Sequence, residues 1–449
     1  MPVTSQTIDK ADFKSKLLTH FDTFQRGAAQ DNSPRALSAL QQEAFKQFES
    51  LDLPTTKHEE WKYTNLRNLL QNDFRFPTES QSSAPNADDV APHLMDHGDA
   101  NVLVFVNGFY RRDLSTLHSP VEELHVENLA QAHAKYTEVI DKYFARIATY
   151  QKDVFTALNT AVSDNGAFIY VPSNKVIEKP VYLYFITDAT EANVVSQPRN
   201  LFVVGRNSQA TFVESFRTIG ANIGFTNVVT EVVVQENAVA EYYKIQNETS
   251  QAYHIGTTQA LQARDSKFSS TTVSLSGSLI RNNLNIVIDA ENCESNLYGL
   301  YVLNGKSHVD NHTLVDHAKP RSYSNELYKG ILDEQSTGVF NGKIMVRPDA
   351  QKTNAFQSNR NIVLSAEASM NTKPQLEIFA DDVKCSHGAT TGQLDEEMLF
   401  YLRSRGIGQE AAKALLMQAF AGDVLNHIRL EPVKNYVEAV IANRFGAQA

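Results

Sequence analysis

Residues 167–392 form a long succession of short runs rich in β-branched and aromatic residues. Runs such as VYLYFIT, NLFVVG and NVVTEVVVQ are separated by Asn, Gly, Ser and Asp, the residue types that form turns. No part of this segment has the periodicity of a helix of ordinary length. It must therefore fold as strands, either as an all-β sandwich or as a β-solenoid in which each coil stacks on the previous one.

A weak internal sequence repeat favours the solenoid. Leu297 and Tyr298 recur thirty positions later as Leu327 and Tyr328. Self-similarity at a fixed period is typical of stacked repeats, although this instance is weak. We therefore expect a mainly β protein with a solenoid core.

Helical patterns precede the β segment, in residues 1 to about 75 and again between 126 and 162. Apolar residues in 35–51 recur every three or four positions, as on one face of a helix. Trp61, the only tryptophan, is interpreted as a packing anchor. Residues 77–97 are rich in Ser, Pro, Asp and Asn, which is typical of a linker. Apolar runs on either side of Asn107-Gly108 predict a β-hairpin.

Helices return after the β segment. Three acidic residues from Asp395 onward suit the start of a helix that ends near Gly406, and two further helices follow, separated by Pro432. We therefore divide the chain into a mainly helical domain (1–165, with a hairpin near 102–115), a β core (166–392) and a helical domain (393–449).

Charge and composition exclude several classes of protein. The chain has 41 basic and 52 acidic residues, a net charge of −11, so a phosphate backbone would repel it and nucleic acid is not an expected partner. No apolar run approaches the roughly 20 residues of a membrane helix. The first residues contain acids and no apolar signal segment. Together with the absence of a disulfide framework, this leads us to expect a cytoplasmic protein.

Cys385 and His387 stand two positions apart in the stretch DDVKCSHGATTG. In a strand both side chains point to one face, where a thiolate and an imidazole suit iron or zinc. A Cys-His nucleophile would also need an orienting residue and an oxyanion hole, which the sequence does not reveal. The third interpretation is structural, a buried cysteine beside a histidine, and the residues alone favour it.

A second polar cluster lies in HVDNHTLVDH and contains His308, Asp310, His312, Asp316 and His317. In a strand, positions 308, 310 and 312 share a face and could bind a divalent metal. Because no fourth ligand is evident, a polar sheet face with cross-strand hydrogen bonds is favoured. His308, His312 and His317 remain secondary metal candidates.

The cysteine count limits any iron-sulfur chemistry. A complete cluster usually has four ligands, mostly thiolates, and this chain has 2 cysteines. Cys293 lies close to Glu291 and Glu294, whose charges disfavour its thiolate. If the chain handles a cluster, another chain must supply ligands.

Residues 351–407 closely resemble the signature region of the SufD type within the SufB/SufD family of the SUF iron-sulfur cluster assembly system. The stretches EEWKYTNL, VFVNGFY and HVDNHTLVDHAKP are also similar to segments of this family, so the resemblance covers essentially the whole chain. The SufB type is cysteine-rich, whereas this chain is cysteine-poor.

This resemblance implies a right-handed parallel β-helix between two helical domains. It implies a non-catalytic scaffold in a complex with one SufB-like chain and two SufC-like ATPases, and a homodimer when the chain is isolated. The two β-helices pair, and iron or a transient cluster is handled near their interface. Reduced flavin is linked to the complex, with no residue here assigned to it.

Carried over to this sequence, the resemblance places Cys385 and His387 on an interfacial Cys-x-His, of which the histidine is the better candidate ligand. It also implies that the C-terminal helices bind the ATPase. For that contact we expect Leu399, Tyr401, Leu415 and Phe420.

A rival function is that of a carbohydrate-active enzyme, since β-helices of this kind often carry lyases and glycosidases. Such an enzyme would use clustered carboxylates, and the candidates are Asp310, Asp316, Asp381 and Asp382. The expected cytoplasmic location argues against this alternative.

Overall fold

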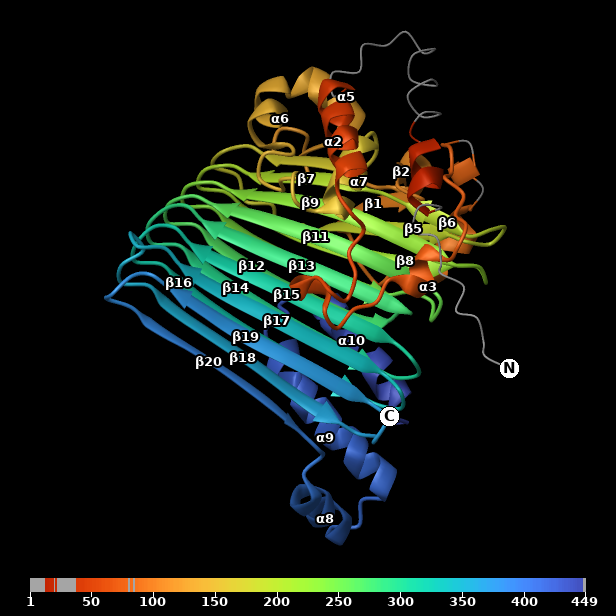
Figure 1. Cartoon of the computed structure of the whole chain (residues 1–449), viewed down its shortest axis with the longest axis vertical. Helices are drawn as coiled ribbons and strands as arrows, with labels where there is room; N and C mark the ends of the chain where they lie inside the picture. Colours follow the sequence, from red (N-terminus) through yellow and green to blue (C-terminus); the bar gives the residue numbers. More distant parts are fainter. Residues whose placement is uncertain (1–12, 20, 22–37, 80, 84, 447–449) are drawn as a thin grey trace.

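The structure of the chain is a computed structural model, which describes residues 13–19, 21, 38–79, 81–83 and 85–446. Parts of the expected N-terminal helical region, residues 1–12 and 22–37, lie outside the described residues. Within these limits two β-sheets of ten strands each run along most of the molecule, and helices cover the sheets at both ends of the chain (Figure 1).

We call the sheet that ends in β20 sheet B and the one that ends in β19 sheet A. Sheet B consists, in spatial order, of β2 (Phe109–Tyr110), β1 (Asn101–Val106), β5 (Val181–Asp188), β8 (Gln209–Ile219), β10 (Val239–Asn247), β12 (Lys267–Ser276), β14 (Glu294–Leu303), β16 (Tyr323–Leu332), β18 (Asn354–Val363) and β20 (Lys384–Gly392). Sheet A consists of β19 (Ser369–Ile378), β17 (Thr337–Val346), β15 (His308–His317), β13 (Leu279–Ile288), β11 (Tyr253–Gln262), β9 (Gly224–Val234), β7 (Arg199–Val204), β4 (Ala167–Val171) and β3 (His125–Asn128), with β6 (Val194–Ser196) beside β9.

From β8 onward the chain alternates between the two sheets and returns to each in the same direction. The pairs β8–β10, β9–β11 and all later pairs are parallel, whereas β1–β2 and β3–β4 are antiparallel. This is the topology of a parallel β-solenoid. The predicted solenoid between helical flanks is therefore confirmed, and the sandwich is excluded.

A left-handed backbone residue recurs at one corner of successive coils. Asn and Asp adopt this conformation more readily than most residues. Their amides also stack, since Nδ2 of Asn207 donates to Oδ1 of Asn174 at 2.8 Å and Nδ2 of Asn237 donates to Oδ1 of Asn207 at 3.0 Å. The corner residues with positive φ are Asn174, Asn207, Asn237, Asp265, Asn292, Arg321 and Lys352.

The strand register shows that the weak internal repeat in the sequence does not mark equivalent positions. Tyr298 of β14 lies beside Leu327 of β16, and Gly299 lies beside Tyr328. Because adjacent residues of a strand point to opposite faces, Tyr328 enters the core between the sheets, whereas Tyr298 packs towards the C-terminal helices. The two tyrosines that suggested a repeat are thus not equivalent positions.

Two glycines make room for large rings in the core between the sheets. A Cβ atom at Gly299 would lie 2.1 Å from the ring of Tyr328, and one at Gly330 would lie 2.2 Å from the ring of Tyr301. Both tyrosines are almost completely buried. The coils can therefore stack here only because these positions have no side chain.

The N-terminal helices cover the outer face of sheet A. They are α2 (Ser38–Ser50), α3 (Arg67–Leu70), α5 (Leu129–Lys135), α6 (Thr137–Tyr143) and α7 (Val154–Ala161), with a 3-10 turn η1 (Glu59–Trp61). Trp61 is buried in this layer beside Phe155, as expected of a packing anchor. A fully buried ion pair helps to connect sheet A with the N-terminal layer. Arg199 donates to Glu231 at 2.7 Å, and Glu231 also accepts the backbone N–H groups of Ala145 and Ala148.

Residues 77–97 are not the simple linker that their composition predicts. They form the short helices η2 (Gln81–Ser83), α4 (Ala87–Val90) and η3 (Ala91–His93), and η4 (Arg112–Leu114) follows later. Asn86 and Asp89 form a capping box at the start of α4. Val90 and Met95 are buried against the outer face of sheet B. Asn, Asp and Ser favour helix starts as well as loops, so their abundance alone does not identify a linker.

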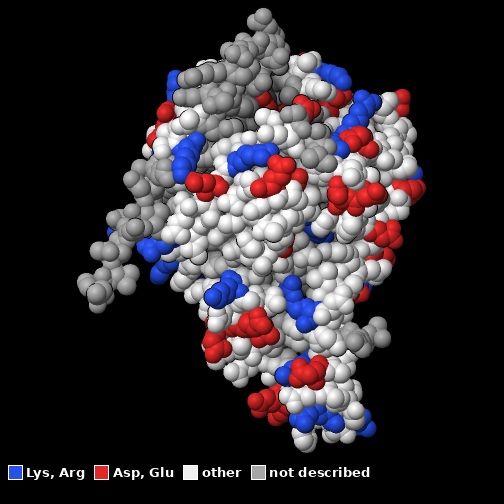
Figure 2. Space-filling model, turned by 90° about the vertical axis from the view of Figure 1, so that its right-hand side faces the viewer, with Lys and Arg blue, Asp and Glu red and all other residues white. Residues whose placement is uncertain are grey.

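The three predicted C-terminal helices are α8 (Glu396–Ser404), α9 (Gln409–Leu425) and α10 (Glu431–Arg444). Helices α9 and α10 pack on the outer face of sheet B. Lys329 of β16 anchors α9, since its Nζ lies 2.6 Å from Oδ2 of Asp423 and 3.7 Å from the ring centre of Phe420. Helix α8 contains no buried residue and projects from the molecule (Figures 1 and 2). In the part of the chain described here, no helix has both the length and the apolar character needed to cross a bilayer.

Candidate functional site

The solenoid ends in two long strands that each have a neighbour on one side only. Among the described residues, β19 is the edge of sheet A and β20 is the edge of sheet B. Every residue of β20 is exposed except Cys385, which is half-buried. Unpaired N–H and C=O groups along such an edge are a template for a strand of another chain. This open end is thus a surface to which a further chain can add.

Cys385 and His387 both point inward from β20. The register places Cys385 beside the buried Ala355 and His387 beside the buried Gln357. Cys385 packs against a small apolar cluster that includes Ile344 of the opposite sheet. Burial raises the pKa of the Cys385 thiol, opposed in part by a hydrogen bond with the backbone of Ala355. The thiol thus favours its protonated form, whereas the exposed imidazole of His387 is accessible to a metal ion.

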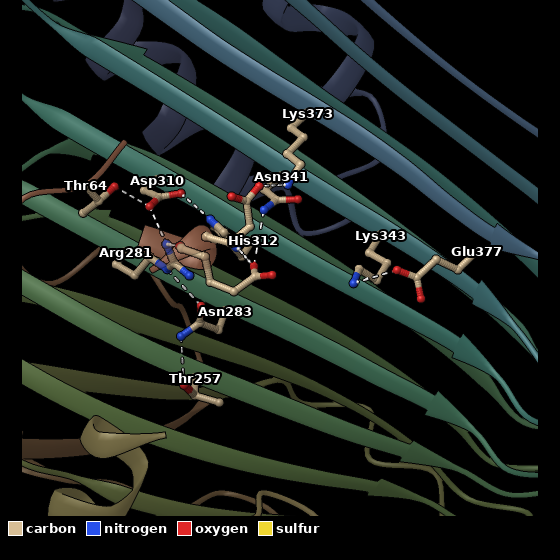
Figure 3. Close-up of polar contacts among 12 residues, drawn as sticks. Thr64, Thr257, Arg281, Asn283, Asp310, His312, Asn341, Lys343, Lys373 and Glu377 are labelled. Atoms are coloured by element: carbon tan, nitrogen blue, oxygen red, sulfur yellow. Dashed lines mark hydrogen bonds and ion pairs between the residues drawn. The ribbon is translucent and has the colours of Figure 1, made fainter. Parts of the chain in front are cut away.

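The polar cluster of β15 is divided between the two faces of sheet A. His308, Asp310 and His312 face outward, beneath the segment around Thr64, as the alternation predicts. Figure 3 shows Asp310 and His312. His317 lies on the inner face, where its Nε2 is 2.9 Å from Oγ of Ser324 and burial lowers its pKa to about 4. The three secondary metal candidates therefore do not converge.

Asp310 is the centre of a buried network (Figure 3). Its Oδ2 accepts hydrogen bonds from Arg281 at 2.5 Å and from Thr64, and its Oδ1 lies 3.0 Å from Nε2 of His312. Burial alone would raise the pKa of Asp310, but the charges of Arg281 and His312 hold it well below its usual range. Asp310 is thus a fixed anion that its neighbours already neutralise.

The network joins the segment around η1 to the solenoid. Nδ1 of His312 lies 3.2 Å from Oε2 of Glu60, and Nε2 of His308 lies 2.9 Å from Oγ1 of Thr64. Both ring nitrogens of His312 are therefore engaged. Within the described ranges, no group of three or more His, Cys, Asp or Glu side chains is arranged to hold a metal ion. These contacts therefore hold the segment around η1 on sheet A.

A groove of about 820 Å³ lies between this segment and the outer face of sheet A. Its floor carries amide and hydroxyl side chains, and Asn283 and Thr257 in Figure 3 belong to it. Lys343 on the same floor is paired with Glu377 at 3.0 Å. The four aspartates proposed for sugar chemistry are Asp310, Asp316, Asp381 and Asp382. None of them is among the described residues that line the groove. The four carboxylates that this rival hypothesis names are therefore not gathered in the groove, whose own acidic lining residues are Asp52, Glu59, Glu60 and Asp153.

The four residues expected to bind an ATPase differ in accessibility. Tyr401 and Leu415 are exposed, Leu399 is half-buried, and Phe420 packs on Lys329 of the solenoid. Phe400, which the sequence reasoning missed, is the most exposed large apolar residue of α8, at 73%. The signal in the sequence that could have found Phe400 is an apolar residue on the solvent-facing side of the predicted helix.

Comparison with known proteins assigns the family. A family model described as the SufBD protein N-terminal region matches residues 12–183, and one described as SUF system FeS cluster assembly, SufBD core domain, matches residues 185–420. The chain belongs to the SufBD family. It is thus an iron-sulfur cluster assembly protein, and the expected resemblance is confirmed.

Individual SufBD relatives match over most of their length. An iron-sulfur cluster assembly SufBD family protein of Synechocystis is 34% identical over 88% of both chains. The iron-sulfur cluster assembly protein SufD of Escherichia coli is 31% identical over 92% of this chain and 93% of the relative. The SufD protein of Bacillus subtilis is 27% identical over 92% and 94%.

Proposed function

We propose that this SufBD chain is a non-catalytic scaffold that holds iron or a nascent cluster at the open end of its solenoid. The observation that carries this proposal is the position of His387 and Cys385 on the last edge strand, β20, with the imidazole exposed. His387 is the main ligand and Cys385 an auxiliary one. Because a cluster usually needs four ligands, the remaining ligands come from a second chain.

That second chain is a SufB-like scaffold, paired along the edge strands. A strand added to β19 or β20 satisfies backbone groups that are otherwise open to water. It also covers the exposed side chains of β20, among them His387. Pairing would therefore place the second chain's ligands next to this imidazole. The same edges account for a homodimer when the partner is absent.

A SufC-like ATPase binds the C-terminal helices, chiefly α8. Met398, Phe400 and Tyr401 leave an apolar surface exposed on this projecting helix. The anchor between Lys329 and Asp423 connects the neighbouring helix α9 to β16. Movement of the ATPase can thus reach the strands of sheet B, while ATP hydrolysis stays with the partner.

The decisive experiment for the iron site compares His387→Ala with the matched variant His118→Ala, which removes an exposed histidine far from β20. Each variant is co-expressed with SufB-like and SufC-like partners. Purified complexes are then assayed for subunit content, bound iron and iron-sulfur absorption. We expect normal assembly in both variants and a severalfold loss of iron and absorption in His387→Ala only. A full cluster yield from His387→Ala would remove His387 from the site.

The ATPase surface is tested with Phe400→Asp. Because Phe400 is 73% exposed, this change should leave folding intact and weaken the complex with the ATPase. Leu117→Asp is the control, since Leu117 is an exposed apolar residue at 45% and lies outside the C-terminal helices. Equal binding by both variants would show that α8 is not the docking helix.

A further inference from the structure

Three residues on adjacent strands of sheet B form a row that runs inward from the open end. Glu326 of β16 lies beside Gln357 of β18, and Gln357 lies beside His387 of β20. All three point into the space between the sheets, since Tyr328, two residues from Glu326, belongs to the core there. Glu326 is 2% exposed and Gln357 is 4% exposed, so only His387 reaches the surface.

The inner end of this row fixes the orientation of the amide of Gln357. Its Nε2 donates to Oε2 of Glu326 at 2.7 Å. This bond turns the NH₂ end of the amide towards Glu326 and the carbonyl end away from it, since an amide nitrogen only donates and an amide oxygen only accepts. A Cβ atom at Gly342 would lie 2.4 Å from Nε2 of Gln357, so the glycine on the opposite sheet leaves the space that the amide occupies.

The outer end of the amide is left without a partner. Oε1 of Gln357 is buried, and it accepts no hydrogen bond within the described residues. A buried acceptor of this kind is destabilising and calls for an explanation in a native structure. The neighbour of Gln357 in register on that side is His387, whose ring carries an N–H group in either neutral tautomer.

We propose that Gln357 is a positioning residue for His387, with Glu326 as its anchor. Oε1 of Gln357 accepts a hydrogen bond from one ring nitrogen of His387, and this leaves the other nitrogen unprotonated and directed towards the open end. Ligating histidines commonly have their second nitrogen fixed in this way, which sets the tautomer and the orientation of the ring. The inference rests on the proposed role of His387 as an iron ligand.

The test is the tautomer of His387 in the isolated full-length chain without metal, read from long-range ¹H–¹⁵N correlations of the histidine rings. His387→Ala assigns the signal among the 13 histidines. We expect one dominant tautomer in the wild type. Gln357→Met keeps an unbranched side chain but has no strong acceptor. In this variant the population ratio of the two neutral tautomers of His387 should move about tenfold towards equality, which is the effect of losing one ordinary hydrogen bond.

Two further variants separate this effect from general damage to the core. Gln357→Glu combined with Glu326→Gln exchanges the two groups, so the hydrogen bond between positions 326 and 357 and an acceptor towards His387 are both kept, and the double variant should favour the same tautomer as the wild type. Gln246→Met removes a buried amide from β10, distant from β20 in the sheet order, and should leave the ratio unchanged. An unchanged ratio in Gln357→Met, or the same relaxation in the double variant Gln357→Glu/Glu326→Gln, overturns the inference. Neither result depends on cluster yield, so the proposed iron site stands or falls separately, on His387→Ala.

Discussion

Replacing Glu326 with Gln is expected to stabilise the protein at alkaline pH and to have little effect near pH 4.5. Glu326 is 2% exposed, and burial raises the pKa of its carboxyl to about 7, while the neighbouring side chains of Thr313 and Gln357 oppose this in part. Gln has a similar shape and carries no charge. Its carbonyl can still accept from Gln357, and its NH₂ group can donate to the hydroxyl of Thr313.

The sign of the pH dependence follows from the raised pKa of Glu326. Between its ordinary value of 4.5 and about 7, the folded chain holds this proton more tightly than the unfolded chain does. The stabilisation associated with the protonated form is therefore complete below about pH 4.5 and is lost as the pH rises through about 7. The interval from 4.5 to about 7 corresponds to about 3 kcal/mol of unfolding free energy. Glu326→Gln has no such proton and escapes this loss.

The assay is guanidinium chloride unfolding of wild type and variant at about pH 5 and about pH 8. The advantage of Glu326→Gln in unfolding free energy should grow by about 2 to 3 kcal/mol between the two conditions. Glu367→Gln is the control, since Glu367 is an exposed carboxylate in the turn that precedes β19. If Glu326→Gln and Glu367→Gln show the same pH dependence, the reasoning about a costly buried carboxylate is wrong.

Three further substitutions test the packing of the solenoid and of the helices on it. Gly330→Ala should destabilise the fold by about 3 kcal/mol, because the new methyl group would strike the ring of Tyr301, and Tyr301→Leu in the same chain should restore much of the loss in thermal unfolding. Arg199→Met should cost about 3 to 5 kcal/mol by leaving the carboxylate of Glu231 buried without its counter-charge, and adding Glu231→Gln should recover part of it. Lys329→Met should release α9 at a cost of about 2 kcal/mol, seen as faster hydrogen exchange in α9 and α10 while the exchange of β8 to β12 stays unchanged. Unchanged exchange in α9 would contradict the anchoring role.

The elements of this fold are largely predictable because they depend on local patterns. The β-branched runs, separated by turn residues, define the strands of the solenoid, and apolar spacing defines the C-terminal helices. The sequence-based predictions that failed concern residue types that can have two local roles. In residues 77–97, Asn and Asp serve as helix caps and not only as loop formers, and a capping box at Asn86 decides between these roles. Similarly, Tyr298 and Tyr328 look like a repeat, but the register places them on opposite faces.

The candidate site is predictable only in part. Alternation along a strand was sufficient to place Cys385 and His387 on one face. It could not reveal that Asp310 meets Thr64 and Arg281, which come from distant segments. Nor could it reveal Gln357 and Glu326 behind His387, because each of the three lies on a different coil. Contacts between coils depend on the length of every turn, and a change of one residue reverses which side chains face inward.

The sequence by itself determined that this chain forms a β-rich core with helical flanks and that two cysteines cannot complete a cluster, since both follow from local residue patterns and counts. Tertiary structure alone decided the register of the coils, the open edges of β19 and β20, and the row from Glu326 to His387. The physical reason is that hydrogen bonds between coils, not the order of residues along the chain, determine which side chains become neighbours.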